Sequence, residues 1–142
     1  MLQWNQQFVT GNSKIDSQHR ALISQINRLE EMAHNTNPNR QEVEFILNLV
    51  DFVENYTKMH FAHEEDCMNR HRCPAHQENK AAHGQFLEFF REFKRRFEAE
   101  GCRPTVLKEL HDTCSSWIQD HILKIDTRLK PCLDAEIPTG EA

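Results

Sequence analysis

The chain has 142 residues, which is the size of one ordinary domain. Its net charge of −5 and its single short basic cluster at residues 94–96 argue against a nucleic-acid-binding surface, which needs an excess of Lys and Arg on one face. Polar sequence follows Met1, and the chain lacks an apolar run of about 18 residues, so we expect no membrane span, no signal peptide and a cytoplasmic location.

Four helices are predicted, because the few Gly and Pro residues separate long segments whose apolar residues recur at spacings of three, four and seven. The expected ranges are 17–34, 40–69, 76–99 and 104–130. Gly101 suits a helix end, and Pro104 suits the first turn of the helix that follows. Short connections between long helices favour antiparallel neighbours, so the predicted fold class is all-α, an up-down-up-down four-helix bundle.

The two ends of the chain are predicted to differ. Trp4, Phe8 and Val9 make an N-terminal arm that is apolar enough to pack along the bundle, so residues 1–130 are expected to form one domain. Residues 131–142 are predicted to be a tail or linker that leads to an output domain in a longer parent protein.

The cysteines are predicted to be reduced thiols. There are five, an odd number, and no CxxC pair occurs, unlike a secreted disulfide framework or a zinc ribbon. We expect Cys67 and Cys114 to be small core residues.

Histidine is unusually frequent, with nine residues, and each helical stripe contains one. The polar residues predicted to face the core are His19, His60, Glu64, His83, His121 and Asp126. Each would cost about 1–3 kcal/mol if it were buried without a partner, so something must satisfy them together. A bound metal does so most simply.

The spacing of these residues supports two metals. His60 and Glu64 are four residues apart and can reach one point in the core, whereas His121 and Asp126 are five apart, about 140° around a helix, and need a local distortion to do so. Imidazole with carboxylate suits iron, manganese or zinc. Six ligands exceed what one tetrahedral zinc takes, so two metals bridged by Glu64 and Asp126 fit better.

Four runs of sequence carry a family resemblance: IDSQH at 15–19, HFAHEE at 60–65, the segment 74–86 that contains His83, and WIQDHILKID at 117–126. Together they resemble the hemerythrin family, specifically bacterial hemerythrin domains. The resemblance implies a non-haem di-iron centre, oxo- or hydroxo-bridged when diferric, with His19 and His60 on one iron and His83 and His121 on the other. It makes Glu64 and Asp126 the bridges. Asn79 stands where the family has a fifth histidine, so it becomes a weak or vacant ligand position.

The resemblance also implies reversible two-electron reduction of dioxygen in an apolar pocket, for which the candidate lining is Phe61, Trp117, Ile118 and Ile122. The Asn79 change leaves an exchangeable position on both irons and predicts faster autoxidation. We therefore expect a binding and sensing domain, without catalysis of its own, that passes an oxygen or redox signal to an output such as a diguanylate cyclase. The alternative is a free-standing oxygen carrier or store.

Other readings fit the residues less well. A ferritin-like oxidase needs Glu-x-x-His on two helices, and only Glu31 and His34 have that spacing. A zinc protease needs HExxH, and Cys67 stands where its second histidine belongs. The remaining histidines are expected outside the centre, His34 at a helix end and the others at the surface: His63, His71, His76 and His111.

Overall fold

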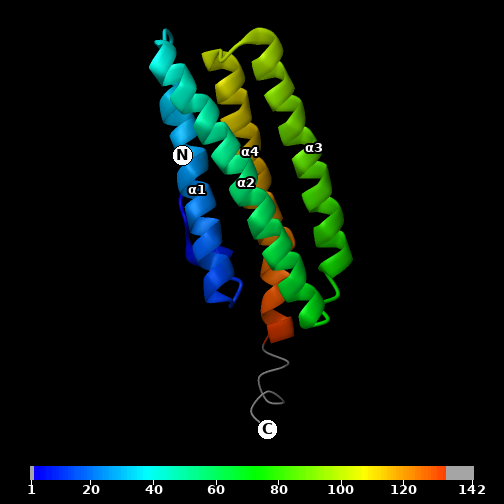
Figure 1. The fold of residues 1–142 in the computed structure, drawn as a ribbon. Helices are drawn as coiled ribbons and strands as arrows, with labels where there is room; N and C mark the ends of the chain where they lie inside the picture. Colours follow the sequence, from blue (N-terminus) through cyan, green and yellow to red (C-terminus); the bar gives the residue numbers. More distant parts are fainter. Residues whose placement is uncertain (1, 134–142) are drawn as a thin grey trace.

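The computed structural model describes residues 2–133, which form a four-helix bundle (Figure 1). The helices are α1 (Ser13–Ala33), α2 (Arg40–Arg70), α3 (His76–Glu100) and α4 (Pro104–Lys124), with short 3-10 helices η1 (Gln6–Phe8) and η2 (Asp126–Arg128). Helix α1 packs against α2 and α4, and α3 packs against the same two helices from the other side of the bundle. The predicted all-α, up-down-up-down architecture is confirmed.

Side-chain caps mark the start of two helices, and a glycine ends a third. Asn12 accepts a hydrogen bond from the backbone N–H of Ile15, so α1 begins at Ser13, four residues earlier than predicted. Asn39 and Glu42 form a capping box at the start of α2. Gly101 closes α3 with φ +84°, a conformation that L side chains rarely adopt.

The prediction of one continuous helix from 104 to 130 is wrong. Helix α4 ends at Lys124, Ile125 (φ −119°, ψ −55°) is its C-cap, and η2 follows before a helical turn resumes at residues 129–133. The first three residues of the predicted linker thus belong to this turn, and the rest of it, 134–142, lies outside the described residues.

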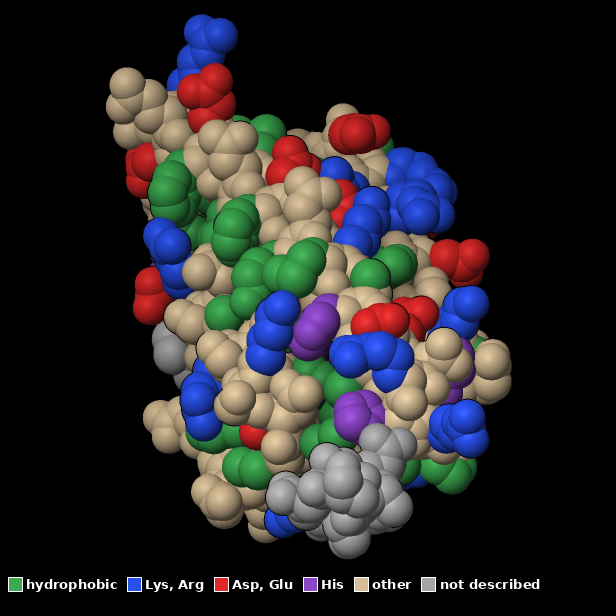
Figure 2. Space-filling view, turned by 60° about the horizontal axis from the view of Figure 1, so that its bottom comes forward, with side chains coloured by type: hydrophobic (Ala, Val, Ile, Leu, Met, Phe, Trp, Pro, Cys, Tyr) green, Lys and Arg blue, Asp and Glu red, His purple; other side chains and the backbone are tan. Residues whose placement is uncertain are grey.

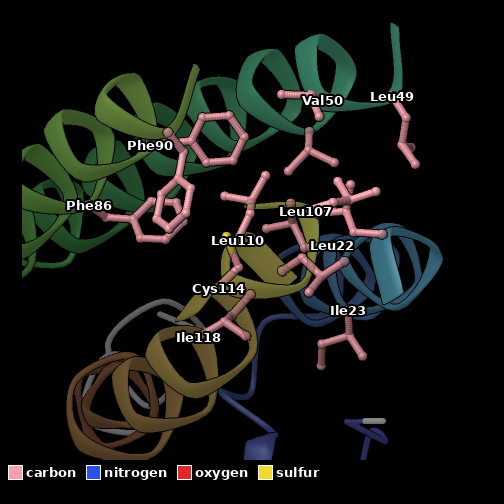
Figure 3. Close-up of a cluster of buried hydrophobic side chains, with 14 of the residues drawn as sticks. Leu22, Ile23, Leu49, Val50, Phe86, Phe90, Leu107, Leu110, Cys114 and Ile118 are labelled. Atoms are coloured by element: carbon pink, nitrogen blue, oxygen red, sulfur yellow. The ribbon is translucent and has the colours of Figure 1, made fainter. Parts of the chain in front are cut away.

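Two apolar clusters fill the bundle, one at each side of a polar layer. The larger one, shown in Figure 3, includes Leu22, Phe86 and Leu110. The smaller one lies where the α2–α3 connection meets the segment after α4 and consists of Ile15, Cys67, Met68, Cys73, Ala75 and Leu129. The predicted metal ligands lie between these clusters along each helix, as His19 does between Ile15 and Leu22 on α1.

The N-terminal arm packs on the bundle as predicted. Phe8 is fully buried in the larger cluster, and Trp4 packs against it with ring centroids 5.6 Å apart. Within residues 2–133, no helix has the length and apolar character needed to cross a membrane.

The expectation that all cysteines are reduced is wrong for one pair, because Cys73 and Cys132 form a disulfide. The turn at 129–133 carries Cys132 back over the α2–α3 connection, where the two Cα atoms are 5.6 Å apart. Sequence motifs gave no sign of this pair, because 59 positions separate its members. Cys67 and Cys114 are buried free thiols, as predicted.

Candidate metal centre

The structure brings the six predicted ligands together in the bundle interior. The residues are His19 from α1, His60 and Glu64 from α2, His83 from α3, His121 from α4 and Asp126 from η2, all of them buried. Their donor atoms form two overlapping groups in which all atoms lie within 4.8 Å of one another. We call them site A (His19, His60, Glu64, Asp126) and site B (His83, His121, Glu64, Asp126).

Glu64 faces both sites with different oxygens. Its Oε2 lies 3.2 Å from His19 Nε2 and 3.4 Å from His60 Nε2, both in site A. Its Oε1 lies 3.1 Å from His83 Nε2 in site B. A carboxylate that bridges two metal ions needs this arrangement, with one oxygen directed at each ion.

Asp126 repeats this division from the other side. Its Oδ2 lies 3.1 Å from His19 Nε2, and its Oδ1 lies 3.1 Å from His121 Nε2. Because α4 ends at Lys124, Asp126 is not held at the position it would have on a continuous helix. The distortion that the five-residue spacing required is therefore present.

The hydrogen bonding of the centre fits a metal better than it fits a closed protein network. Among the described residues, buried atoms without a hydrogen-bond partner include His19 Nε2, Glu64 Oε2, His83 Nε2 and Asp126 Oδ1. These atoms nevertheless lie 3.1–3.4 Å from an opposite donor or acceptor, so they converge without the alignment of hydrogen bonds. Nitrogen and oxygen lone pairs that converge in this way suit a divalent transition metal.

In the metal-free protein, protonated His19 supplies part of the positive charge that balances the buried carboxylates Glu64 and Asp126. Burial alone would lower the pKa of His19, but the close contacts and negative charges of the Asp126 and Glu64 carboxylates outweigh it and raise the pKa to about 10. Burial alone would raise the pKa of Glu64, but close contacts with the His19, His60 and His83 rings hold it well below its usual value. His60 has a lowered pKa, mainly because burial disfavours its charged form.

Two residues that our sequence analysis missed contact predicted ligand histidines and orient them. His60 Nδ1 lies 2.8 Å from Gln18 Oε1, and His83 Nδ1 lies 2.9 Å from Glu65 Oε2. Each contact uses the Nδ1–H and leaves Nε2 directed at the centre. The available signal was adjacency, since Gln18 precedes one predicted ligand and Glu65 follows another.

Asn79 is completely buried and lies within site B. Its Nδ2 donates to Glu64 Oε1 at 2.9 Å, and its Oδ1 lies in hydrogen-bond contact with His121 Nε2 at 2.7 Å. The same Nδ2 lies 3.2 Å from Met68 Sδ. The amide thus links a shared carboxylate to a site B imidazole.

Aromatic rings cover site B, and a small cavity lies behind them. Phe61 stacks on His83 with centroids 3.7 Å apart, and Trp117 stacks on His121 at 4.3 Å. A cavity of ≈ 10 Å³ is lined by Leu22, Ile26, Val53, Thr57, Phe61, Phe86, Trp117 and Ile118. Three of the four predicted pocket residues therefore line it, whereas the fourth, Ile122, is fully buried but does not.

The other histidines lie outside the centre. His34 is the C-cap of α1 and is exposed, and His63, His71 and His76 are half-buried. On the face shown in Figure 2, histidine side chains appear at separate places rather than in one surface cluster.

The surface prediction for His111 is wrong. It is 5% exposed because α1 packs over α4, and its Nε2 lies 3.5 Å from Glu30 on α1. Its Nδ1 lies 2.9 Å from Asp112.

Comparison with known proteins identifies the family. The model of the hemerythrin HHE cation-binding domain matches residues 10–133. A bacteriohemerythrin from Stenotrophomonas maltophilia is 31% identical over 122 residues, which are 86% of this chain and 74% of that protein. A bacteriohemerythrin from Clostridium acetobutylicum is 26% identical over 89% of this chain and 96% of its own length.

A solved structure agrees with these sequence relatives. The crystal structure of a wild-type hemerythrin superposes with a TM-score of 0.82 at 25% identity, covering 94% of this chain and 98% of that one. The family match, the relatives and the buried His and carboxylate centre agree, and the chain belongs to the hemerythrin family.

Proposed function

We propose that this chain binds two iron ions and uses them to bind dioxygen reversibly. His19 and His60 would hold one ion and His83 and His121 the other, with Glu64 and Asp126 bridging them. The observation that carries this proposal is the orientation of Glu64 and Asp126. Each carboxylate turns one oxygen toward the histidines of site A and the other oxygen toward those of site B.

Two ferrous ions would supply the two electrons that reversible dioxygen binding requires. The chain's own residues prepare the site for them. Gln18 and Glu65 fix the orientation of two imidazoles, which keeps their Nε2 atoms directed at the centre. Phe61 covers a face of the His83 ring and Trp117 a face of the His121 ring, which excludes water, and the adjoining small cavity has a largely apolar lining.

A second candidate function is redox sensing, which Asn79 favours. An amide in place of an imidazole gives site B a weaker donor, so the ferrous pair should be lost to autoxidation faster than in a dedicated store. The matched regions cover 74% of the Stenotrophomonas protein, 96% of the Clostridium protein and 98% of the crystallised hemerythrin, and an output domain is not part of this proposal. We therefore assign the function to the bundle itself.

The test is to load the purified protein with Fe²⁺ without oxygen, count bound iron, and record the optical spectrum before and after exposure to air. We expect two irons per chain and the absorption of an oxo-bridged diferric pair after oxidation. A Glu64→Ala variant should lose both, and His63→Ala, a half-buried histidine on the same helix, should lose neither. One iron or none per wild-type chain would refute the proposal.

The rate of oxidation separates the two candidate functions. A long-lived oxygenated form favours reversible carriage, and conversion within seconds to the diferric form favours sensing.

A further inference from the structure

His83 is held by two consecutive residues of α2, one at each ring nitrogen. Glu64 Oε1 lies 3.1 Å from its Nε2, and Glu65 Oε2 lies 2.9 Å from its Nδ1. Phe61, one turn earlier on α2, stacks on the ring face with an interplanar angle of 3°. Neighbouring residues of one helix therefore fix both the position and the tilt of a ring that α3 supplies.

The equivalent contact in site A is chemically different. His60 Nδ1 is held by the neutral amide of Gln18, which is itself buried. The partner of His83 is a carboxylate, and 23% of its side chain is exposed. Partial exposure lets Glu65 keep its charge without a large desolvation cost, whereas an ion at the position of Gln18 would be expensive to bury.

The charged partner, Glu65, is found at site B, which has the weaker set of ligands. Asn79 adjoins site B and contacts His121, and its neutral amide is a weaker metal donor than an imidazole. A carboxylate that accepts the Nδ1–H of an imidazole makes the opposite nitrogen a stronger base and places a negative charge near the metal.

We propose that Glu65 is a positioning residue that strengthens His83 as a ligand of site B and thereby offsets the imidazole that Asn79 does not provide. This inference rests on the two-metal function proposed above. Glu65 acts through its charge as well as by orienting the ring, and its influence is confined to the second metal position.

The inference can be tested by titrating the metal-free protein with Co²⁺ and following the visible absorption bands and a competing chelator. Wild type should bind two ions in distinguishable steps. Glu65→Gln keeps an acceptor for the Nδ1–H but removes the charge, so the second ion should bind about tenfold or more weakly while the first is unaffected. Asp66→Asn removes a neighbouring exposed charge that pairs with Arg70, and it should match wild type.

The other outcomes are equally decisive. If Glu65→Gln binds both ions as wild type does, Glu65 adds no charge effect and the inference is overturned. The inference is also overturned if Glu65→Gln weakens both binding steps equally, or if Asp66→Asn weakens binding as much as Glu65→Gln does. In either case the effect would not be local to site B. A wild-type protein that binds fewer than two ions would instead refute the two-metal function itself, and the inference with it. Circular dichroism of each metal-free variant shows whether the fold is kept.

Discussion

His121 and Asp126 meet across the end of a helix. Although five residues separate them, His121 Nε2 lies 3.1 Å from Asp126 Oδ1, because α4 stops at Lys124 and η2 turns Asp126 back toward the interior. The smaller apolar cluster keeps this turn in place through Leu129, which is completely buried. The helix break is therefore part of the centre.

Replacing Asp126 should weaken both metal positions, because its two oxygens face different sites. We expect Asp126→Asn to weaken the binding of both Zn²⁺ ions, measured by equilibrium dialysis. Asp112→Asn changes an exposed carboxylate on α4 and should leave the binding unchanged. Loss of only one ion, with normal affinity for the other, would show that Asp126 does not bridge.

The sequence was sufficient to predict the bundle and the convergence of six side chains. A period of 3.6 residues places His19 and Leu22 on one face of α1, and the same period places His60 and Glu64 on one face of α2. These relations are local to one helix. Antiparallel packing then brings such faces together, so a polar layer could be inferred without knowing any interhelical distance.

What the sequence could not supply depends on contacts between distant segments. The break at Ile125 follows from where the turn after α4 packs, not from a Gly or Pro. The burial of His111 depends on α1 lying over α4, and the Cys73–Cys132 bond joins positions 59 residues apart. The contact between Glu65 and His83 requires the register of α2 against α3.

Placing an imidazole at position 79 should strengthen site B. In Asn79→His the amide that now joins Glu64 to His121 is replaced by a strong donor, so we expect tighter binding of the second metal and slower autoxidation of the iron-loaded protein. Stopped-flow absorption after mixing with aerated buffer measures the rate. Asn69→His, near the end of the same α2 helix that carries Glu64, adds a histidine outside the centre and serves as the control. An unchanged rate would show that Asn79 does not limit the stability of the ferrous form.

Metal binding should release a proton from His19. Its pKa of about 10 means that the ring is protonated at pH 7 in the metal-free protein, and an imidazole must be neutral to bind a metal ion. We expect the affinity for Zn²⁺ to rise as the pH increases from 7 toward 10, measured by competition with a chelator. His19→Gln should remove this part of the pH dependence, and a flat profile in wild type would contradict the assignment.

The same protonation should affect folding stability in the opposite direction. Because the pKa of His19 is raised above 6.5 in the folded state, its contribution to stability is fully present below pH 6.5 and is lost as the pH rises through about 10. Chemical denaturation of the metal-free protein should therefore show a decrease in the free energy of unfolding over this range. His19→Gln should show a smaller decrease.

Reducing the Cys73–Cys132 bond should destabilise the fold. A cross-link over 59 positions restricts the unfolded chain, and such bonds typically contribute about 2–4 kcal/mol. We expect Cys73→Ser to lower the free energy of unfolding by about this amount and to abolish the effect of a reductant. Cys102→Ser changes a free, half-buried thiol and should keep the response. Titration of the unreduced protein should find three free thiols, and five would contradict the bond.

Truncating Phe61 should cost stability and open the cavity beside site B. The ring is 4% exposed, stacks on His83 and lines the ≈ 10 Å³ cavity, so we expect Phe61→Ala to lower the free energy of unfolding by about 3–5 kcal/mol. Phe52→Ala removes a ring from the same helix that is 49% exposed, and it should cost much less. In the iron-loaded protein, the enlarged apolar space should let a small ligand such as azide bind faster in Phe61→Ala. If the two variants lose equal stability and bind azide at the wild-type rate, neither the packing of Phe61 nor the cavity has the role assigned to it.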